Sequence, residues 1–137
     1  METIAVWLDG LYAQAGACHI QLSGGEPTLR EDLDAIIRLC KEKGFPYIQL
    51  NTNGLRFAAD PSLAKRLKEA GLTCVFLQFD GLDDATHRRL RAASLRMQKE
   101  AAVDACASAG LPVILVPTLA RGINEHELLP LDRKSVV

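Results

Sequence analysis

Short runs of aliphatic, aromatic and β-branched residues alternate along the chain with longer stretches whose apolar positions recur every three or four residues. The runs are typical of strands and the longer stretches of amphipathic helices. A glycine stands just before each run, where a helix C-terminal cap belongs. The pattern therefore predicts strands at residues 18–22, 47–51, 73–80 and 112–119, preceded by Gly16, Gly44, Gly71 and Gly110.

Two helices are expected between the first three strands. Thr28 and Glu31 have the spacing of a capping box, and Asp60 followed by Pro61 is a favourable helix start. The buried stripes comprise Leu29, Leu33, Ile36, Ile37 and Cys40 in the first helix, and Leu63, Leu67 and Ala70 in the second.

The stretch 83–109 is long enough for two helices, with a break near residues 92–94. A first helix is expected at 2–12, whereas the tail after Glu127 has no clear helical pattern. The inward positions predicted here are Ile4, Trp7, Leu8 and Leu11 in the first helix, and Met97, Ala101, Ala105 and Ala109 before the last strand.

Helices and strands that alternate at a period of roughly 30 residues indicate right-handed βα units. The predicted fold class is α/β, with order αβαβαβαβ and four parallel strands in an open sheet or a segment of a barrel. At 137 residues, of which 48% are hydrophobic, the chain has the size and composition of one globular domain, residues 1–137.

Polar residues recur inside three of the strands, which is unusual because parallel strands covered on both faces are nearly all apolar. Each strand has an apolar residue, a glutamine, an apolar residue and then a small polar residue. Side chains alternate between faces, so the polar residues of each strand share one face, while Leu22, Leu50 and Phe79 face the helices. The polar residues are Gln21 and Ser23, Gln49 and Asn51, and Gln78 and Asp80, and Thr118 has the last polar position in the fourth strand.

Two interpretations follow from these polar positions. Glutamines that bond to one another or to buried water fit a structural core, and this is the better interpretation for one strand alone. Three strands with the same pattern favour a polar ligand at the carboxyl ends, where ligands bind in α/β sheets and barrels. Glycine-containing turns at 23–27, 51–54 and 80–81 lie at this end, where bare backbone can approach a ligand.

The motifs Ser-Gly-Gly-Glu-Pro at 23–27, Asn-Thr-Asn-Gly at 51–54 and Gln-Phe-Asp-Gly at 78–81 closely resemble those of radical S-adenosylmethionine (SAM) proteins. The resemblance runs from about residue 16 to 127. It is strongest to the branch with radical methyltransferases of pterin precursors and lipid-coupling enzymes, and weaker to molybdenum cofactor biosynthesis protein A.

This resemblance implies a truncated part of a (βα)6 partial TIM barrel that binds SAM. The enzyme, when complete, would reductively cleave SAM to a 5′-deoxyadenosyl radical. Gly24, Gly25 and Glu26 would contact the methionine amino group, and the adenine would lie beside Val116, Pro117 and Thr118. The full set of implied cofactor-binding residues is Gly24, Gly25, Glu26, Pro27, Asn51, Thr52, Asn53, Gln78, Asp80 and Thr118.

The family holds a four-iron four-sulfur cluster with three cysteines in a CxxxCxxC loop, and the chain has neither this loop nor its strand. Cys18, Cys40, Cys74 and Cys106 are too far apart to replace it and are expected to be buried free thiols. His19, His87 and His126 have no suitably spaced partner either. No residue is therefore assigned a catalytic or metal-ligating role. The domain is expected to be an incomplete core that also lacks the last βα unit. The fragment alone is expected to be inactive.

Composition limits the partners. A net charge of −1 favours neither nucleic acid nor anionic lipid, and the apolar runs are too short to cross a bilayer, so the cytoplasm is the expected location. The partner of the full-length enzyme would be a small-molecule substrate, and exposed sheet edges predict self-association. The alternative function is a noncatalytic α/β module that binds a small ligand or serves in assembly.

Overall fold

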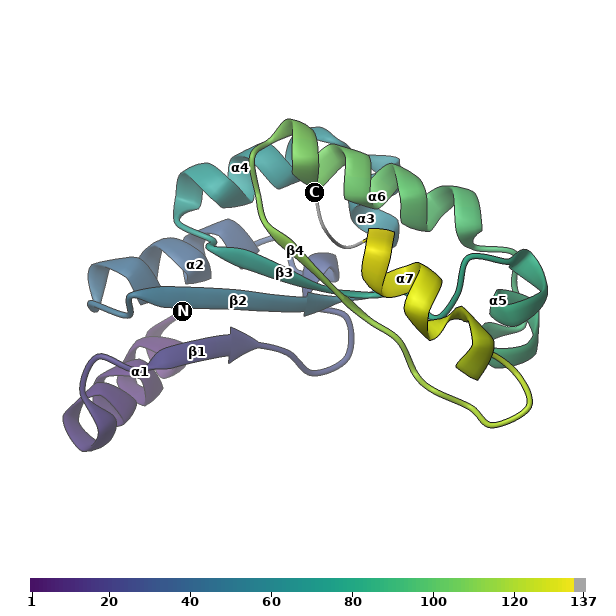
Figure 1. The fold of residues 1–137 in the computed structure, drawn as a ribbon. Helices are drawn as coiled ribbons and strands as arrows, with labels where there is room; N and C mark the ends of the chain where they lie inside the picture. Colours follow the sequence, from purple (N-terminus) through teal and green to yellow (C-terminus); the bar gives the residue numbers. More distant parts are fainter. Residues whose placement is uncertain (135–137) are drawn as a thin grey trace.

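The computed structural model describes residues 1–134 as a four-stranded parallel sheet with helices packed on one face (Figure 1). Neighbouring strands follow chain order, β1-β2-β3-β4, and all three pairings are parallel, as predicted. The strands are β1 (His19–Leu22), β2 (Tyr47–Thr52), β3 (Cys74–Gln78) and β4 (Val113–Val116). The helices are α1 (Glu2–Ala15), α2 (Leu33–Glu42), α3 (Leu55–Ala59), α4 (Ser62–Ala70), α5 (Asp84–Arg91), α6 (Arg96–Ser108) and α7 (Leu128–Lys134), with 3-10 turns η1 (Pro27–Leu29) and η2 (Glu125–Glu127).

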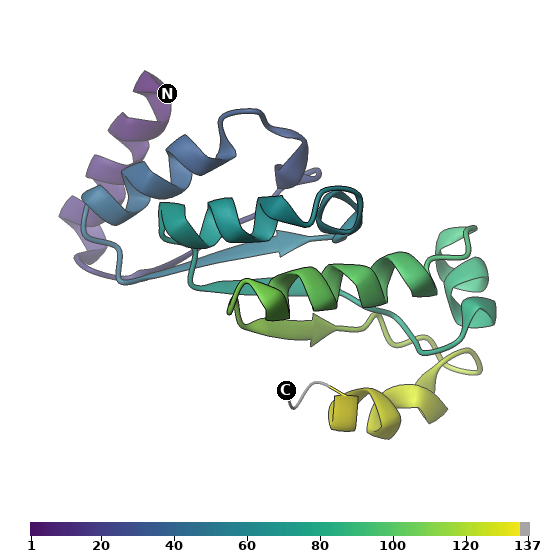
Figure 2. The ribbon, with the colours of Figure 1, turned by 90° about the horizontal axis from the view of Figure 1, so that it is seen from above.

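The hydrophobic core lies between the sheet and one layer formed by α2, α3, α4 and α6 (Figures 1 and 2). Leu50 and Phe79 are fully buried in it, which confirms the face predicted for them. The opposite face has no helical layer among the described residues, and Ile114 and Val116 of β4 are exposed there. Among residues 1–134, none of the helices combines the length and apolar character that crossing a bilayer requires.

The start of α2 differs from the prediction. Thr28 does not cap this helix, because it lies in η1, where the Glu26 carboxylate accepts hydrogen bonds from its amide and its hydroxyl. α2 begins only at Leu33, and Leu29 is exposed instead of joining the buried stripe. The capping-box prediction was wrong because a nearer carboxylate takes the donors of Thr28.

The predicted faces of α1 and α6 are also partly wrong. Leu8 of α1 is buried, but Trp7 is 70% exposed, since α1 packs beside α2 and not under the sheet. In α6, Met97 is 79% exposed and the buried positions are Lys99, Ala102, Ala105 and Cys106. The predicted break between α5 and α6 is confirmed, with Ala92 in the left-handed region (φ 57°).

Two further boundaries differ. β4 ends at Val116, because Pro117 has no amide hydrogen to continue the ladder, so Thr118 lies in the following loop. In the tail after Glu127, which has no helical pattern in the sequence, residues 128–134 form the short helix α7, and the last three residues of the tail lie outside the described residues. Pro130 occupies the first turn of α7, where proline is tolerated.

Candidate functional site

A polar cavity of about 390 Å³ lies at the carboxyl ends of the strands, on the face without a helical layer. Most of the residues expected to bind cofactor line it: Gly25, Glu26, Asn51, Thr52, Asn53, Gln78 and Thr118, together with Ser23 and Val116. Gly24, Pro27 and Asp80 are not among the lining residues. The structure therefore brings together residues from the carboxyl ends of β2, β3 and β4 and from the loops that follow β1, β2 and β4.

The first half of the cavity, the Glu26 rim, comprises residues 23–27 after β1 and residues 51–54, which form the end of β2 and the turn after it. Glu26 joins these two loops. One carboxylate oxygen accepts hydrogen bonds from the hydroxyls of Thr28 and Thr52 at 2.6 Å each, and the other accepts one from the Asn53 amide at 2.8 Å. The carboxylate thus fixes both loops to each other.

The ionisation of Glu26 follows from these contacts. Partial burial alone would raise the pKa of this carboxyl group, but the hydrogen bonds from Asn53, Thr28 and Thr52 outweigh it and lower the pKa below its usual value. Glu26 is therefore an anion at neutral pH, and the donors to its carboxylate are backbone amides and threonine hydroxyls, which are neutral.

Glycines leave the backbone of this rim bare. Gly24 and Gly25 have positive φ angles of 95° and 28°, and a Cβ atom added to either would meet no atom within 4 Å. Their backbone groups border open space, into which a ligand can come close. Gly54, with φ 79°, is different, because a Cβ atom there would lie 2.4 Å from Leu77 Cδ1. Position 54 therefore requires glycine both for its backbone conformation and for packing.

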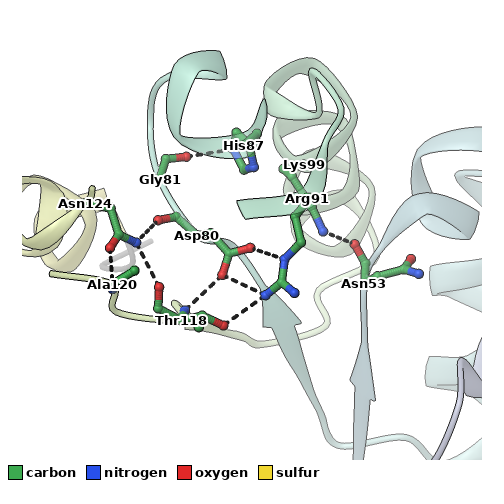
Figure 3. A network of polar contacts seen from close by, with 9 residues as sticks. All are labelled: Asn53, Asp80, Gly81, His87, Arg91, Lys99, Thr118, Ala120 and Asn124. Carbon is green, nitrogen blue, oxygen red and sulfur yellow. Dashed lines mark hydrogen bonds and ion pairs between the residues drawn. The ribbon is translucent and has the colours of Figure 1, made fainter. Parts of the chain in front are cut away.

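The second half, the Asp80 rim, comprises the loops after β3 and β4 and is organised by an ion pair (Figure 3). Asp80 is fully buried and accepts hydrogen bonds from Arg91 Nε at 2.8 Å and from the Thr118 amide at 2.9 Å. Arg91 also donates to the Thr118 hydroxyl at 2.9 Å, and its Nε lies 2.9 Å from the amide oxygen of Gln78 in the orientation that its neighbours require.

Asp80 therefore shapes the cavity through Arg91, Thr118 and Gln78 without lining it. Burial would raise the pKa of Asp80, but the hydrogen bonds from Arg91 and Thr118 and the charge of Arg91 lower it overall. Sequence reasoning missed Arg91, because an arginine at the end of an exposed helix is usually a surface residue.

Two polar residues of the C-terminal segment hold the loops of the Asp80 rim together, and their role was also missed. The Asn124 side chain donates to the carbonyls of Asp80 (2.7 Å) and Thr118 (2.9 Å) (Figure 3). The buried carboxylate of Glu127 accepts hydrogen bonds from the amides of Leu82 and Asp83 and from the Thr86 hydroxyl. The segment 121–127 thus supports the site instead of facing a ligand.

The three glutamines share one face, but their common position in the sequence pattern does not put the third beside the other two in the sheet. Gln21 is paired with Gln49, yet Gln49 is paired with Cys74, and Gln78 is paired with Val116 further along the sheet. Staggered strands are expected where a sheet curves as part of a barrel. The stagger puts Gln78 at the cavity and leaves Gln21 and Gln49 outside its lining.

The cysteines are all free, and three of them are buried as expected, whereas Cys18 is partly exposed. Burial raises the pKa of Cys40 to about 11 and that of Cys106 to about 12, so both are protonated thiols at neutral pH. Within residues 1–134, no group of three or more His, Cys, Asp or Glu side chains could hold a metal ion. These residues do not fit an iron-sulfur cluster, which needs thiolates close together.

A curved parallel sheet with a polar cavity at its carboxyl edge defines an α/β protein that can bind a small ligand. The sequence comparison gives the particular family: the model of the Radical SAM superfamily matches residues 2–134. The chain belongs to this superfamily, which confirms the resemblance noted in its motifs.

The curated relatives agree with the expected branches. The chain is similar to 7,8-dihydro-6-hydroxymethylpterin dimethyltransferase of Methanocaldococcus jannaschii, with 42% identity over 110 residues that cover 80% of the chain and 22% of the relative. It is also similar to the probable GTP 3′,8-cyclase of Methanothermobacter marburgensis (34% identity, 82% of the chain, 36% of the relative) and to GTP 3′,8-cyclase of Staphylococcus aureus (32%, 88%, 35%). The chain thus spans between about a fifth and a little over a third of the length of these relatives.

Proposed function

We propose that this chain is the SAM-binding part of a radical SAM enzyme that, when complete, cleaves SAM reductively to a 5′-deoxyadenosyl radical. The observation that carries the proposal is the cavity at the carboxyl edge of the sheet, where the Gly-Gly-Glu-Pro and Asn-Thr-Asn-Gly motifs meet. Its volume of about 390 Å³ is within the range of small-molecule sites, which is about 300–1,000 Å³.

The chemistry of the lining supports a ligand that is charged at one end and apolar at the other. On the Glu26 rim, the bare backbone of Gly24 and Gly25 beside an anionic carboxylate suits the ammonium group of the methionine moiety. Asn51, Thr52 and Asn53 are the proposed contacts of its carboxylate or of the ribose. On the Asp80 rim, Gln78 suits the ribose, and the exposed side chain of Val116 offers an apolar surface to the adenine.

The reducing electron cannot enter through residues of this chain, because its cysteines do not fit a cluster. We propose that the cluster ligands lie on another segment of a longer parent protein, which the limited coverage of the relatives supports. On this proposal the 137-residue chain contributes ligand binding and no catalytic group. The parent acts on a small-molecule substrate in the cytoplasm.

SAM binding by this chain is the direct test, and β4 offers a matched pair of variants. Ile114 and Val116 are exposed to similar extents (43% and 39%) on the same face of this strand, but only Val116 lines the cavity. We expect Val116→Glu to weaken SAM binding at least about tenfold in isothermal titration calorimetry, because it puts a charge against the adenine. Ile114→Glu should leave the affinity unchanged, and equal effects of the two variants would contradict the proposed site.

The complete reaction needs a different experiment. A longer gene product, reconstituted anaerobically with iron and sulfide, should gain a cluster and form 5′-deoxyadenosine from SAM. The 137-residue chain under the same conditions should do neither. If the longer product also fails, the noncatalytic α/β module becomes the better description.

Self-association belongs to the same proposal. β1 and β4 each have a neighbour on one side only among the described residues, so each presents unpaired backbone groups along its other side. We expect dimers or larger species in light scattering at high protein concentration. A strictly monomeric chain would contradict this part of the proposal and leave SAM binding untouched.

A further inference from the structure

Lys99 is a buried lysine on a helix face that is otherwise formed by small residues. It is 1% exposed, and the other buried residues of α6 are Ala102, Ala105 and Cys106. A lysine is almost never fully buried unless its ammonium group has a partner, because removal from water disfavours the charge. The position of this ammonium group therefore needs an explanation.

The Lys99 ammonium group contacts a lining residue of the cavity from the buried side of that residue. Its Nζ atom donates a hydrogen bond to the backbone carbonyl of Asn53 (Figure 3), and Asn53 lines the cavity. The amide of the same residue donates to Glu26 Oε2 at 2.8 Å. Asn53 is thus held on one side by the carboxylate of the Gly-Gly-Glu-Pro motif and on the other by the ammonium group.

Charged groups from three other segments act on Lys99. The pKa of Lys99 is lowered to about 8, chiefly because burial disfavours the charged form; Asp80 and Glu26 oppose this shift, and Arg91 adds to it. Below this pH the ammonium form holds the Asn53 carbonyl with a charge-assisted hydrogen bond, which is roughly twice as strong as a neutral one. Above it the neutral amine holds the carbonyl more weakly.

A purely structural role is a poor explanation of a lysine at this place. Methionine has a similar length and would fill the space without the penalty of removing a charge from water. The charge must therefore act on its neighbours, and the neighbour to which it donates is the peptide that lines the cavity.

We propose that Lys99 is a positioning residue of the ligand site: its buried ammonium group fixes the Asn53 peptide in the binding conformation, so that ligand affinity falls when the positive charge is lost. This inference rests on the proposed SAM site and adds a residue outside the motifs.

The first test compares SAM affinity from pH 6.5 to 9.5 in the wild-type chain, Lys99→Arg, Lys99→Met and Lys65→Met. Lys65 is an exposed lysine on α4 and serves as the matched control. We expect Lys99→Met to bind about tenfold more weakly than the wild type at pH 7 and Lys99→Arg to stay within about threefold, since arginine keeps its charge throughout this range. The affinity of the wild type relative to Lys99→Arg should fall about fivefold as the lysine deprotonates.

The amino group of SAM titrates in the same pH range, but it does so for every variant, so the ratio between variants isolates the effect of Lys99. Thermal unfolding of each variant establishes that it is folded. A Lys99→Met variant that is folded and binds within twofold of the wild type at every pH overturns the proposal.

A second measurement needs no ligand. The Asn53 carbonyl and the Gly54 amide belong to one peptide group, so the ¹⁵N shift of Gly54 should titrate near pH 8 in the wild type and stay constant in Lys99→Arg and Lys99→Met. If Gly54 titrates but the wild type binds no SAM, the proposed function fails and the positioning role in SAM binding fails with it, although the Lys99 ammonium group still holds the Asn53 peptide. If SAM binds, Gly54 does not titrate and Lys99→Met keeps its affinity, the positioning role fails and the proposed function stands.

Discussion

The Glu26 rim and the Asp80 rim of the cavity are each held together by a carboxylate, but the two carboxylates have different kinds of partner. In each, one carboxylate ties the loops that follow two neighbouring strands. Glu26 does so with neutral donors from threonine hydroxyls and backbone amides, whereas Asp80 is fully buried and paired with Arg91. The Glu26 carboxylate is therefore held by neutral donors, whereas the charge of Asp80 is balanced by its ion pair with Arg91.

This difference indicates how a ligand with both charges would be oriented. Its cationic groups would favour the Glu26 rim, and its neutral, apolar end would favour the Asp80 rim, where Val116 is exposed. Lys99 lies between the two rims and limits the excess negative charge. The comparison makes separate predictions for the two carboxylates and for the residues that support them.

The largest expected effect is on stability and comes from the Asp80 rim. Asp80→Asn removes the fully buried charge of its pair with Arg91 and turns an amide NH₂ toward the donors of Arg91 and Thr118, so it should lower the free energy of unfolding by about 3 kcal/mol in urea. Asp34→Asn breaks an exposed pair with Arg38 and should change it by no more than about 0.5 kcal/mol. Similar losses in the two variants would show that the Asp80 rim is not held by its ion pair.

A smaller loss in the free energy of unfolding is expected when Gly54 on the Glu26 rim is replaced. Gly54→Ala combines a positive φ with a Cβ that would lie 2.4 Å from Leu77 Cδ1 and 3.2 Å from Ala102 Cβ, so we expect a loss of about 2 kcal/mol. Gly122→Ala has a similar φ of 71° but open space around the new Cβ, and should cost about 1 kcal/mol. If the two variants lose equal free energy of unfolding in thermal or urea denaturation, packing does not contribute to the need for glycine at residue 54.

The same two rims show what sequence reasoning could reach. The four strands, their parallel order and the gathering of Glu26, Asn51 and Gln78 at one edge follow from local patterns and from the geometry of βα units. Lys99 could not be found this way, because its burial depends on where α6 meets the turn after β2.

Local sequence patterns also predicted the wrong partner for a side chain where a tertiary contact competed with the local one. Thr28 and Glu31 have capping-box spacing, but Glu26 takes the hydroxyl and amide of Thr28. Asp80 has the sequence position of a ligand contact, yet its carboxylate faces Arg91, eleven residues later in the chain at the end of α5. Such partnerships are set by the folded chain and leave no periodic signal.

Acid should distinguish Glu26 from an ordinary surface carboxylate. Since the pKa of folded Glu26 lies below its unfolded value of 4.5, its stabilisation is fully present above that pH and is lost as the pH falls through the folded pKa. Glu26→Gln should lower the free energy of unfolding by about 1.5 kcal/mol at pH 6, because an amide NH₂ would face donors, and the loss should shrink in acid. Glu31→Gln, on the exposed surface, is the control, and a loss of equal size at pH 6 and pH 3 would contradict a role for the charge.

The smallest effect is expected in alkali and has the opposite sign. The folded pKa of Lys99 is about 8, below the value of 10.5 for a free lysine, so between these values the unfolded chain binds more protons than the folded one. Stability should therefore rise with pH in this window, by about 1 kcal/mol between pH 7.5 and 9.5. Urea unfolding of the wild type against Lys99→Met measures this rise, which should be missing in the variant. If the wild type gains stability in this pH range while its SAM affinity falls, the buried charge supports binding at the expense of the fold. If the stability of both chains stays constant over this range, Lys99 stays protonated, and the contact between its ammonium group and Asn53 does not depend on pH.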